Sequence, residues 1–352
     1  MGNKSKMYVK LESSNDEVTG SCFRLLATLP NKKEINFLVE CGKFQGNNQE
    51  KFNEKLPFEP RNYDFVILTH NHMDHMGRLP QLFNKGYNKK VYTTTLNKYL
   101  LKPALDDAYK VEENNAKHLK NGMTFTTSDI TSVIENTKGC KYMKAYQPHK
   151  NVNVIFYENG HLPGSAYISV EIFFEGYKSI FLLFSGDYKK YNMLYLTDNI
   201  PEEIKDIPFT IIQESTYGKS DSFEKKSCIK RNIIDTIKNG GSVVIPSFAQ
   251  GRYDEIAYIL KCMQDDNLLD KSIPIGFDGK LPKRYWYIRK KHLELYHYIC
   301  DDILPSNIVE ISKENRESFI HSSGSKIIVT TSGMATYGPA PMYIKHFLKQ
   351  KN

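Results

Sequence analysis

A cluster of metal-binding side chains stands directly after an apolar segment of the chain. Residues 63–69 carry a continuous apolar run, which predicts a buried strand, and the next six residues, His70-Asn71-His72-Met73-Asp74-His75, contain three histidines and an aspartate. Imidazole and carboxylate ligands together suit a borderline-soft divalent ion such as Zn²⁺. A tight loop can turn alternate side chains toward one point. His70 and His72 can then share one ion, while Asp74 and His75 face a second. We therefore expect a fold in which a buried strand ends at a metal centre.

Two more candidate ligands follow predicted strands further along the chain. His161 lies in the turn Gly160-His161-Leu162-Pro163-Gly164-Ser165-Ala166, and Asp187 lies in Ser185-Gly186-Asp187-Tyr188, directly after the apolar residues 179–184. A single His or Asp in a turn is more often a turn or cap residue than a ligand. Their recurrence at strand ends, in a chain that also carries the histidine cluster, favours a ligand role for both.

Net charge, cysteine content and hydropathy indicate which partners and which compartment to expect. The 352 residues carry a formal net charge of +8, which favours polyanionic partners such as nucleic acid, although lysines on an ordinary surface explain the excess equally well. The six cysteines form no C-x-x-C pair, and no secretory signal precedes them, so we expect reduced thiols and a cytoplasmic protein. No apolar run is long enough to cross a bilayer, so we expect no membrane partner.

The order of predicted elements indicates an α/β protein in two parts. Short apolar runs alternate with helical stretches, of which residues 97–118 are one example. A second strand–helix alternation follows, with predicted strands at residues 242–246 and 326–330. Such alternation implies parallel strand pairing in a sheet flanked by helices. We therefore divide the chain into residues 1–214 and residues 215–352.

Several motifs resemble the β-CASP branch of the metallo-β-lactamase-fold nucleases. The H-x-H-x-D-H run, with His161 and Asp187 behind it, resembles the successive metal motifs of that fold. Passages similar to the branch itself are Gly20-Ser21-Cys22-Phe23, Glu40-Cys41-Gly42-Lys43-Phe44-Gln45-Gly46, Gln213-Glu214-Ser215-Thr216-Tyr217-Gly218, Phe248-Ala249-Gln250-Gly251-Arg252 and Thr331-Ser332-Gly333-Met334. The likeness extends over nearly the whole chain. It is greatest to bacterial and archaeal relatives of the endonuclease subunit of the cleavage and polyadenylation specificity factor.

The resemblance implies an α/β fold and a set of metal ligands. Residues 1–214 would form the first part of an αββα metallo-β-lactamase sandwich, and residues 215–352 an inserted β-CASP α/β domain. The resemblance implies two zinc ions per chain. Their ligands would be His70, His72 and His161 for one ion, Asp74 and His75 for the other, and Asp187 as a bridge between them.

The resemblance also implies supporting and substrate-binding residues. Asp74 would orient or deprotonate the attacking water, and Glu214 would hold a ligand histidine by a hydrogen bond. Glu40 stands where the branch commonly has Asp, and we carry it over only as a structural or supporting acid. The predicted phosphate contacts are Arg252, Ser332 and Gly333, since a glycine turn exposes backbone N–H groups. Tyr217 is a candidate platform for base stacking.

The predicted activity is zinc-dependent hydrolysis of RNA, as an endonuclease acting on single strands. Two zinc ions about 3.5–4 Å apart would share a hydroxide that attacks phosphorus. A DNA nuclease, a small-molecule metallo-hydrolase of the same fold, and a nucleic-acid-binding relic without activity remain alternatives.

The last part of the sequence bears on the second zinc. In the family, two histidines follow the inserted domain, one as proton donor and one as a ligand of the second zinc. After Asp187 the only histidines are His292, His297, His321 and His346, none in a matching context. We therefore expect the C-terminal part of the sandwich to be missing. The second zinc would then bind more weakly, and the isolated chain would be impaired by about 10²–10⁴-fold. The chain would be a fragment, or it would be completed by another chain or in a homo-oligomer.

Overall fold

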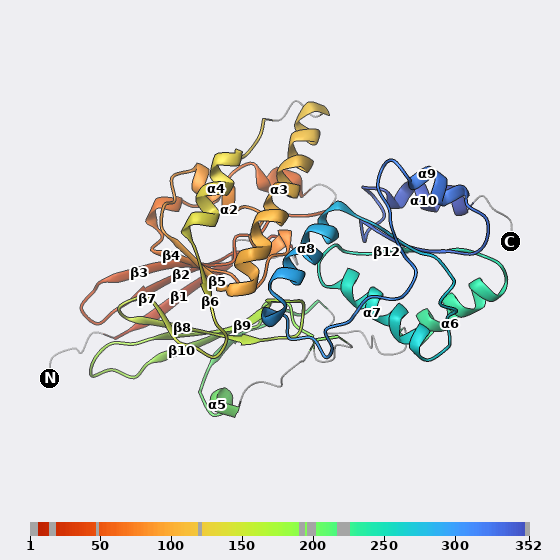
Figure 1. The fold of residues 1–352 in the computed structure, drawn as a ribbon. Helices are drawn as coiled ribbons and strands as arrows, with labels where there is room; N and C mark the ends of the chain where they lie inside the picture. The colour runs from red at the N-terminus through yellow and green to blue at the C-terminus, as the bar shows by residue number, and fades with distance from the viewer. Residues whose placement is uncertain are drawn as a thin grey trace. The chain divides into compact units, whose positions relative to one another are not determined.

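A computed structural model describes most of the chain (Figure 1), namely residues 6–13, 19–46, 49–118, 122–189, 194–195, 202–216 and 226–348. The chain divides into two compact units. Unit 1 comprises Met1–Asn192, Thr197–Thr216 and Glu294–Tyr296, and unit 2 comprises Met193–Leu196, Tyr217–Leu293 and His297–Asn352. The assignment of residues 1–214 and 215–352 to two named domains stays a prediction.

The first sheet of unit 1 has six strands in the order β1–β2–β3–β4–β5–β6. Its strands are β1 (Tyr8–Ser13), β2 (Phe23–Thr28), β3 (Glu34–Val39), β4 (Phe65–Ile67), β5 (Lys90–Thr94) and β6 (Thr137–Cys140). The first three pair antiparallel, and β3 to β6 pair parallel. Parallel neighbours need crossover segments. The helical segments between these strands are η1 (Glu50–Asn53), η2 (Pro60–Asn62), α1 (Met73–Met76), α2 (Leu79–Asn84), α3 (Thr95–His118) and α4 (Thr127–Asn136).

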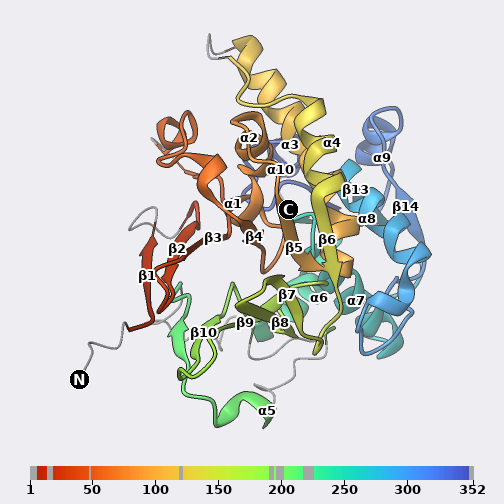
Figure 2. The ribbon, with the colours of Figure 1, turned by 90° about the vertical axis from the view of Figure 1, so that its left-hand side faces the viewer.

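The second sheet of unit 1 has five strands in the order β11–β10–β9–β8–β7. Its elements are β7 (Tyr146–His149), β8 (Val152–Glu158), β9 (Ala166–Ile172), β10 (Ile180–Phe184), α5 (Glu202–Lys205) and β11 (Thr210–Ile212). Figure 2 shows the two sheets as separate layers, with α2, α3 and α4 on the face of the first sheet that is turned away from the second. Unit 1 is therefore a sandwich of two sheets with helices outside.

The core of unit 1 lies between its two sheets. Alternate residues of β9, Ile168, Val170 and Ile172, are fully buried in one cluster with Phe37 and Phe65 from the first sheet. A period of two is what a strand needs to present one apolar face to a facing sheet. The opposite face of the second sheet is covered in part by α5, whose Ile204 packs in a smaller buried cluster with Tyr157 and Leu183.

Unit 2 is built around a four-stranded parallel sheet in the order β12–β15–β13–β14. Its elements are α6 (Lys226–Lys238), β12 (Val243–Pro246), α7 (Arg252–Asp265), β13 (Ile275–Asp278), α8 (Lys280–Lys291), η4 (Leu293–Leu295, shared with unit 1), β14 (Ile308–Glu310), α9 (Arg316–His321), β15 (Ile327–Thr330) and α10 (Ala340–Phe347). Successive residues of β15 enter different cores. Ile327 and Val329 pack with α6 and α7, whereas Ile328 packs with α9 and α10. Helices therefore cover both faces of this sheet.

The predicted α/β class is confirmed, and so are most of the predicted elements. The helix expected at residues 97–118 is α3, and the strands expected at residues 242–246 and 326–330 are β12 and β15. In the described part of the chain, no helix has the length and apolar character that a bilayer crossing requires.

Candidate metal centre

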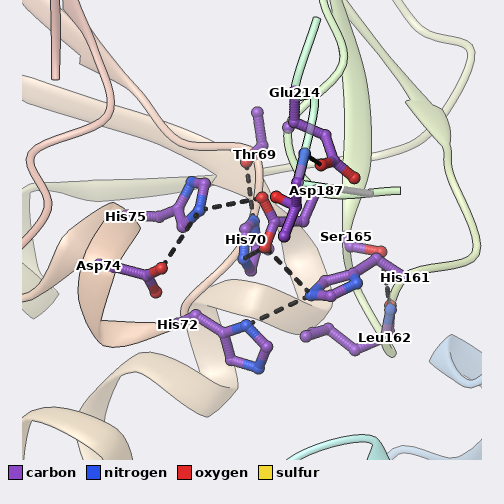
Figure 3. A network of polar contacts seen from close by, with 12 residues as sticks. Thr69, His70, His72, Asp74, His75, His161, Leu162, Ser165, Asp187 and Glu214 are labelled. Atoms are coloured by element: carbon purple, nitrogen blue, oxygen red, sulfur yellow. Dashed lines mark hydrogen bonds and ion pairs between the residues drawn. The ribbon is translucent and has the colours of Figure 1, made fainter. Parts of the chain in front are cut away.

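The candidate ligands of unit 1 lie where strands end (Figure 3). His70 and the following residues come directly after β4, His161 lies in the connection from β8 to β9, and Asp187 follows β10. Because β4 and β10 belong to different sheets, the site joins the two layers at one edge of the sandwich. The structure thus brings together residues that stand more than a hundred positions apart in the sequence.

One group of side chains can hold a single ion. His70, His72, His161 and Asp187 each offer one ligand atom, and these atoms all lie within 4.8 Å of one another. His72 Nδ1 and His161 Nε2 are 3.3 Å apart. Asp187 Oδ2 lies 3.7 Å from His161 Nε2 and 4.0 Å from His70 Nε2. The three imidazoles and one carboxylate therefore converge on one point.

The other oxygen of Asp187 faces a second group. Asp187 Oδ1 lies 3.3 Å from His75 Nε2, and Asp74 Oδ2 lies 4.0 Å from the same nitrogen. His75 is buried, whereas the Asp74 and Asp187 side chains keep about a quarter and 30% of their surface exposed. Asp187 therefore stands between the two groups, with one oxygen toward each.

Burial and neighbouring charges set the protonation of the cluster. Burial, together with the nearby histidines, holds the pKa of His70 and that of His161 well below the ordinary value. Burial acts in the same direction on His75, but the neighbouring carboxylates of Asp187 and Glu40 outweigh it and raise its pKa. Burial would raise the pKa of Asp187, yet the bond with His75 and the adjacent histidines keep it below the usual range. His70 and His161 are therefore neutral, the form in which imidazole binds metals.

An unpaired ring nitrogen shows that the cluster fits a divalent ion. His70 Nδ1 lies 2.9 Å from the hydroxyl of Thr69, but within the described residues its buried Nε2 has no hydrogen-bond partner. The buried Nδ1 of His75 differs, because the Glu40 carboxylate faces it at 3.8 Å. A buried polar atom left without a partner costs about 1–3 kcal/mol. A cation at the convergence point would satisfy His70 Nε2, so the donor set fits a metal.

Two backbone loops hold the candidate metal-binding segment, residues 70–76, in place. The N–H groups of Ser21, Cys41 and Lys43 donate to the carbonyls of Asp74, His75 and Met73, at 2.8, 2.7 and 2.8 Å. A side chain at Gly42 would bring its Cβ within 1.6 Å of the Asp74 carbonyl oxygen. The loops after β1 and β3, which resembled the β-CASP branch in sequence, thus act as backbone supports for α1.

Glu40 has a larger part in the site than its sequence context indicated. Its Oε1 accepts a hydrogen bond of 2.9 Å from the N–H of Thr69, and its Oε2 lies 3.8 Å from Nδ1 of His75. It therefore supports both the start of the metal-binding segment and one of its rings. An acid directly after a buried strand at the same sheet edge was the signal that could have identified it.

Glu214 lies near the cluster but is not hydrogen-bonded to a histidine. Its N–H donates to Ser185 Oγ at 3.0 Å, and its Oε2 accepts from the N–H of Thr216 at 3.0 Å. Within the described residues no hydrogen bond joins its carboxylate to a histidine, so its orienting role stays a prediction. Tyr217, the candidate stacking platform, lies outside the described residues.

The three predicted phosphate contacts belong to unit 2. Arg252 begins α7 and pairs with Glu255 at 2.7 Å, although half of its side chain is exposed. Ser332 Oγ donates to the carbonyl of Tyr337 at 3.2 Å, and Gly333 packs so closely on Phe248 that a Cβ would lie 2.9 Å from its ring. Their contact with a substrate stays a prediction.

Comparison with known proteins gives consistent relatives. A model described as a metallo-β-lactamase superfamily domain matches residues 29–183. Ribonuclease TTHA0252 of Thermus thermophilus is 28% identical over 347 residues, covering 94% of this chain and 74% of the relative. Probable RNase MJ4 of Methanocaldococcus jannaschii is 31% identical over 350 residues, with the same two coverages. Transcription termination factor FttA of Methanosarcina mazei is 27% identical over 354 residues, covering 94% of this chain and 52% of the relative.

The chain thus spans about three-quarters of the two ribonucleases and about half of the termination factor. Its sandwich fold, its histidine and aspartate cluster and these relatives agree with one another. The chain belongs to the β-CASP nuclease family of the metallo-β-lactamase superfamily, whose members are metal-dependent hydrolases.

Proposed function

We propose that the chain is a zinc-dependent ribonuclease that cleaves single-stranded RNA at internal phosphodiester bonds. The observation that carries this proposal is the position of Asp187. Its two carboxylate oxygens face His161 at 3.7 Å and His75 at 3.3 Å. A carboxylate with one oxygen toward each of two ligand groups suits a centre of two ions, as used for phosphodiester hydrolysis.

The ligand types favour zinc. Imidazole nitrogens combined with carboxylate oxygens are common zinc ligands, and His70, His72, His161 and Asp187 would hold the first ion. Asp74, His75 and Asp187 would hold the second, with fewer protein ligands and hence more weakly. Bound zinc would supply Lewis acidity, which makes a water molecule acidic and stabilises charge on the phosphoryl oxygens.

The side chains of the site would orient the reactants and move the proton. Asp74, whose Oδ2 lies 4.0 Å from His75 Nε2 and whose side chain is partly exposed, would accept a proton from the attacking water. The Thr69 hydroxyl fixes the ring of His70 through its Nδ1, and Glu40 faces Nδ1 of His75, so both rings are held before any ion binds. Glu214 is proposed to support this edge from the end of β11.

The proposed substrate follows from the relatives and the charge. Two of the relatives are named as ribonucleases, and the net charge of +8 favours a polyanion. Arg252, Ser332 and Gly333 are proposed phosphate contacts, because a guanidinium and a glycine turn both present N–H donors.

The purified 352-residue protein, loaded with zinc, should cleave an end-labelled single-stranded RNA and give internal fragments. Asp74→Ala should abolish cleavage, while Asp206→Ala, which removes an exposed acid of the same unit, should not. Cleavage that persists without metal, or in Asp74→Ala, would overturn the proposal. Preferential cleavage of single-stranded DNA would reject RNA as the substrate.

A further inference from the structure

Helix α8 of unit 2 carries an unusual concentration of positive charge. Its twelve residues, KLPKRYWYIRKK, include six lysines and arginines and no acid. Most of them recur at spacings of three and four residues, together with one tyrosine, and such spacing places side chains on a single helix face. This face, called the basic stripe, consists of Lys280, Lys283, Arg284, Tyr287, Lys290 and Lys291.

The basic stripe points away from the core of unit 2. The other face of α8 carries Pro282 and Tyr285, which are buried, and Trp286, which packs against the core cluster of the sheet. In the stripe, Lys280 and Lys290 are exposed, and Tyr287 keeps 61% of its surface accessible. A large aromatic ring therefore stands in solvent among cations.

Helix stability does not explain this arrangement. Positive charges near a helix C-terminus interact well with the helix dipole, which would account for Lys290 and Lys291. The same dipole disfavours Lys280 and Lys283 in the first turn, where α8 has no acid. Lys280 and Arg284 are also like charges four residues apart, a spacing at which they repel. The positive charges in the first turn therefore lower the stability of α8.

Neighbouring groups neutralise only part of the charge. Lys283 Nζ lies 3.4 Å from Glu310 and donates to the carbonyl of Ile311 at 3.0 Å. Lys291 Nζ lies 4.5 Å from the centre of the Tyr287 ring. Among the described residues, no ion pair joins Lys280, Lys290 or Lys291 to an acid. Glu314 attracts Lys280 electrostatically. Lys280, Lys290 and Lys291 are nevertheless all exposed, so a partner can reach their charges.

We propose that the basic stripe binds single-stranded RNA, as a second contact outside the metal centre. This inference rests on the proposed function, since it concerns the same substrate. The stripe extends about 16 Å along the helix, so its cations can contact several phosphates, and the exposed Tyr287 ring can stack on a base. Bases stack on a side chain only when unpaired, which favours a single strand over a duplex. A membrane surface is disfavoured, because the apolar face of α8 is packed in the core of unit 2.

Binding of a fluorescent single-stranded RNA is measured by anisotropy on the full chain in EDTA, which stops metal-dependent cleavage. Lys290→Ala with Lys291→Ala should weaken binding roughly tenfold and lower the slope of log Kd against log salt by about 1.4, or 0.7 for each lost phosphate contact. Tyr287→Ala should weaken binding roughly tenfold, and Tyr287→Phe should restore it. All three positions are exposed and lie in a helix, which tolerates alanine, so circular dichroism should be unchanged.

The matched control is Lys238→Ala with Lys271→Ala, which removes the same charge from exposed lysines outside the stripe. It should leave the affinity and the salt slope nearly unchanged. Equal weakening in the control and the stripe variants, or unchanged RNA binding in the stripe variants, would overturn the proposal. So would a loss of binding to phosphatidylserine vesicles without a loss of RNA binding.

A second substrate separates this proposal from the proposed function. A small phosphodiester, bis(4-nitrophenyl) phosphate, needs only the metal centre, so the zinc-loaded stripe variants should hydrolyse it at the wild-type rate. If the wild-type protein hydrolyses neither this compound nor RNA, the proposed function fails, while the anisotropy result still decides the role of the stripe.

Discussion

The two units differ in whether the buried polar groups near their strand ends have hydrogen-bond partners. In unit 1, the buried Nε2 of His70 has no hydrogen-bond partner among the residues that the structure describes. In unit 2, Asp278 at the end of β13 is fully paired. It accepts two bonds from Arg316, at 2.6 and 3.1 Å, and one from the hydroxyl of Tyr343, at 2.7 Å. Both sheets place polar residues at the same kind of edge, but among the described residues only the edge in unit 1 leaves a buried side-chain atom unpaired.

This difference separates a binding site from a structural network. Unpaired buried nitrogens are unfavourable unless something binds there, whereas a satisfied carboxylate holds its own elements together. The pairing of Asp278 raises the pKa of Arg316, because the carboxylate stabilises the guanidinium charge. Substitutions at the two edges should therefore have different consequences. Those in unit 1 should reduce activity, and those in unit 2 should reduce stability.

The largest effect is expected for Asp187→Asn, which keeps the shape of the side chain but removes the charge shared by both ligand groups. RNA cleavage should fall by about 10³-fold or more, since the stabilisation of charge in the transition state is lost. Initial rates on labelled RNA, with zinc content determined by mass spectrometry, measure the effect. A rate within tenfold of the wild type would show that Asp187 is not shared.

The next effect is expected for Asp278→Ala, which leaves the Arg316 guanidinium without its partner in a largely buried position. Unit 2 should lose about 3 kcal/mol of unfolding free energy. The single tryptophan of the chain, Trp286, packs in the core of unit 2, so its fluorescence in urea reports on this unit. Zinc content should not change. Asp301→Ala, which removes an exposed acid of the same unit, is the control. If Asp278→Ala lowers the unfolding free energy no more than this control does, Asp278 has no special role in the stability of unit 2.

A smaller effect is expected for Glu40→Gln. The amide can still accept the hydrogen bond from Thr69, but the negative charge 3.8 Å from His75 is lost. Such supporting contacts are worth about 10- to 100-fold in metal affinity, so the proposed second zinc site should lose that much. Calorimetric titration of the metal-depleted protein measures it. Glu40→Asp retains the charge and serves as the control, and the prediction is wrong if both variants bind zinc alike.

The smallest effect is a pH dependence in unit 2. Burial raises the pKa of Asp254 above 3.8, although Trp286 and Tyr298 donate hydrogen bonds to it. Between pH 3.8 and the raised value, the unfolded chain loses the proton first, so this group destabilises unit 2 as the pH rises. Asp254→Asn should remove this dependence, at most about 1.4 kcal/mol per pH unit. The unfolding free energy of both proteins is measured in urea at several pH values from 4 to 7. The prediction is wrong if the two free energies change with pH in the same way.

Much of this fold could be predicted from the sequence, because its patterns are local. A continuous apolar run followed by His70-Asn71-His72 predicts a buried strand and a metal-binding loop, and β4 ends at Ile67. The helix at residues 97–118 and the central strand β15 follow from equally local periodicity. The metal cluster could be predicted for the same reason, because most of its members stand within six consecutive residues.

The remaining features depend on contacts between distant residues. The contact of Glu40 with His75 spans 35 positions, and no local pattern encodes it. The position of Glu214, whose carboxylate is hydrogen-bonded to Thr216 and not to a ring, depends on how β11 ends. Spacing alone places the basic residues of α8 on one face, but only packing decides that this face is the exposed one.

The backbone around position 42 leaves room for no side chain larger than that of glycine. A methyl group there would overlap the carbonyl oxygen of Asp74, which is backbone and cannot rotate away. Every other amino acid is therefore excluded as long as α1 keeps its place, whereas a metal ligand can be exchanged for another that donates to the same ion. In a survey of distant relatives, a glycine two positions after the acid that follows β3 should mark this site more strictly than any one histidine does.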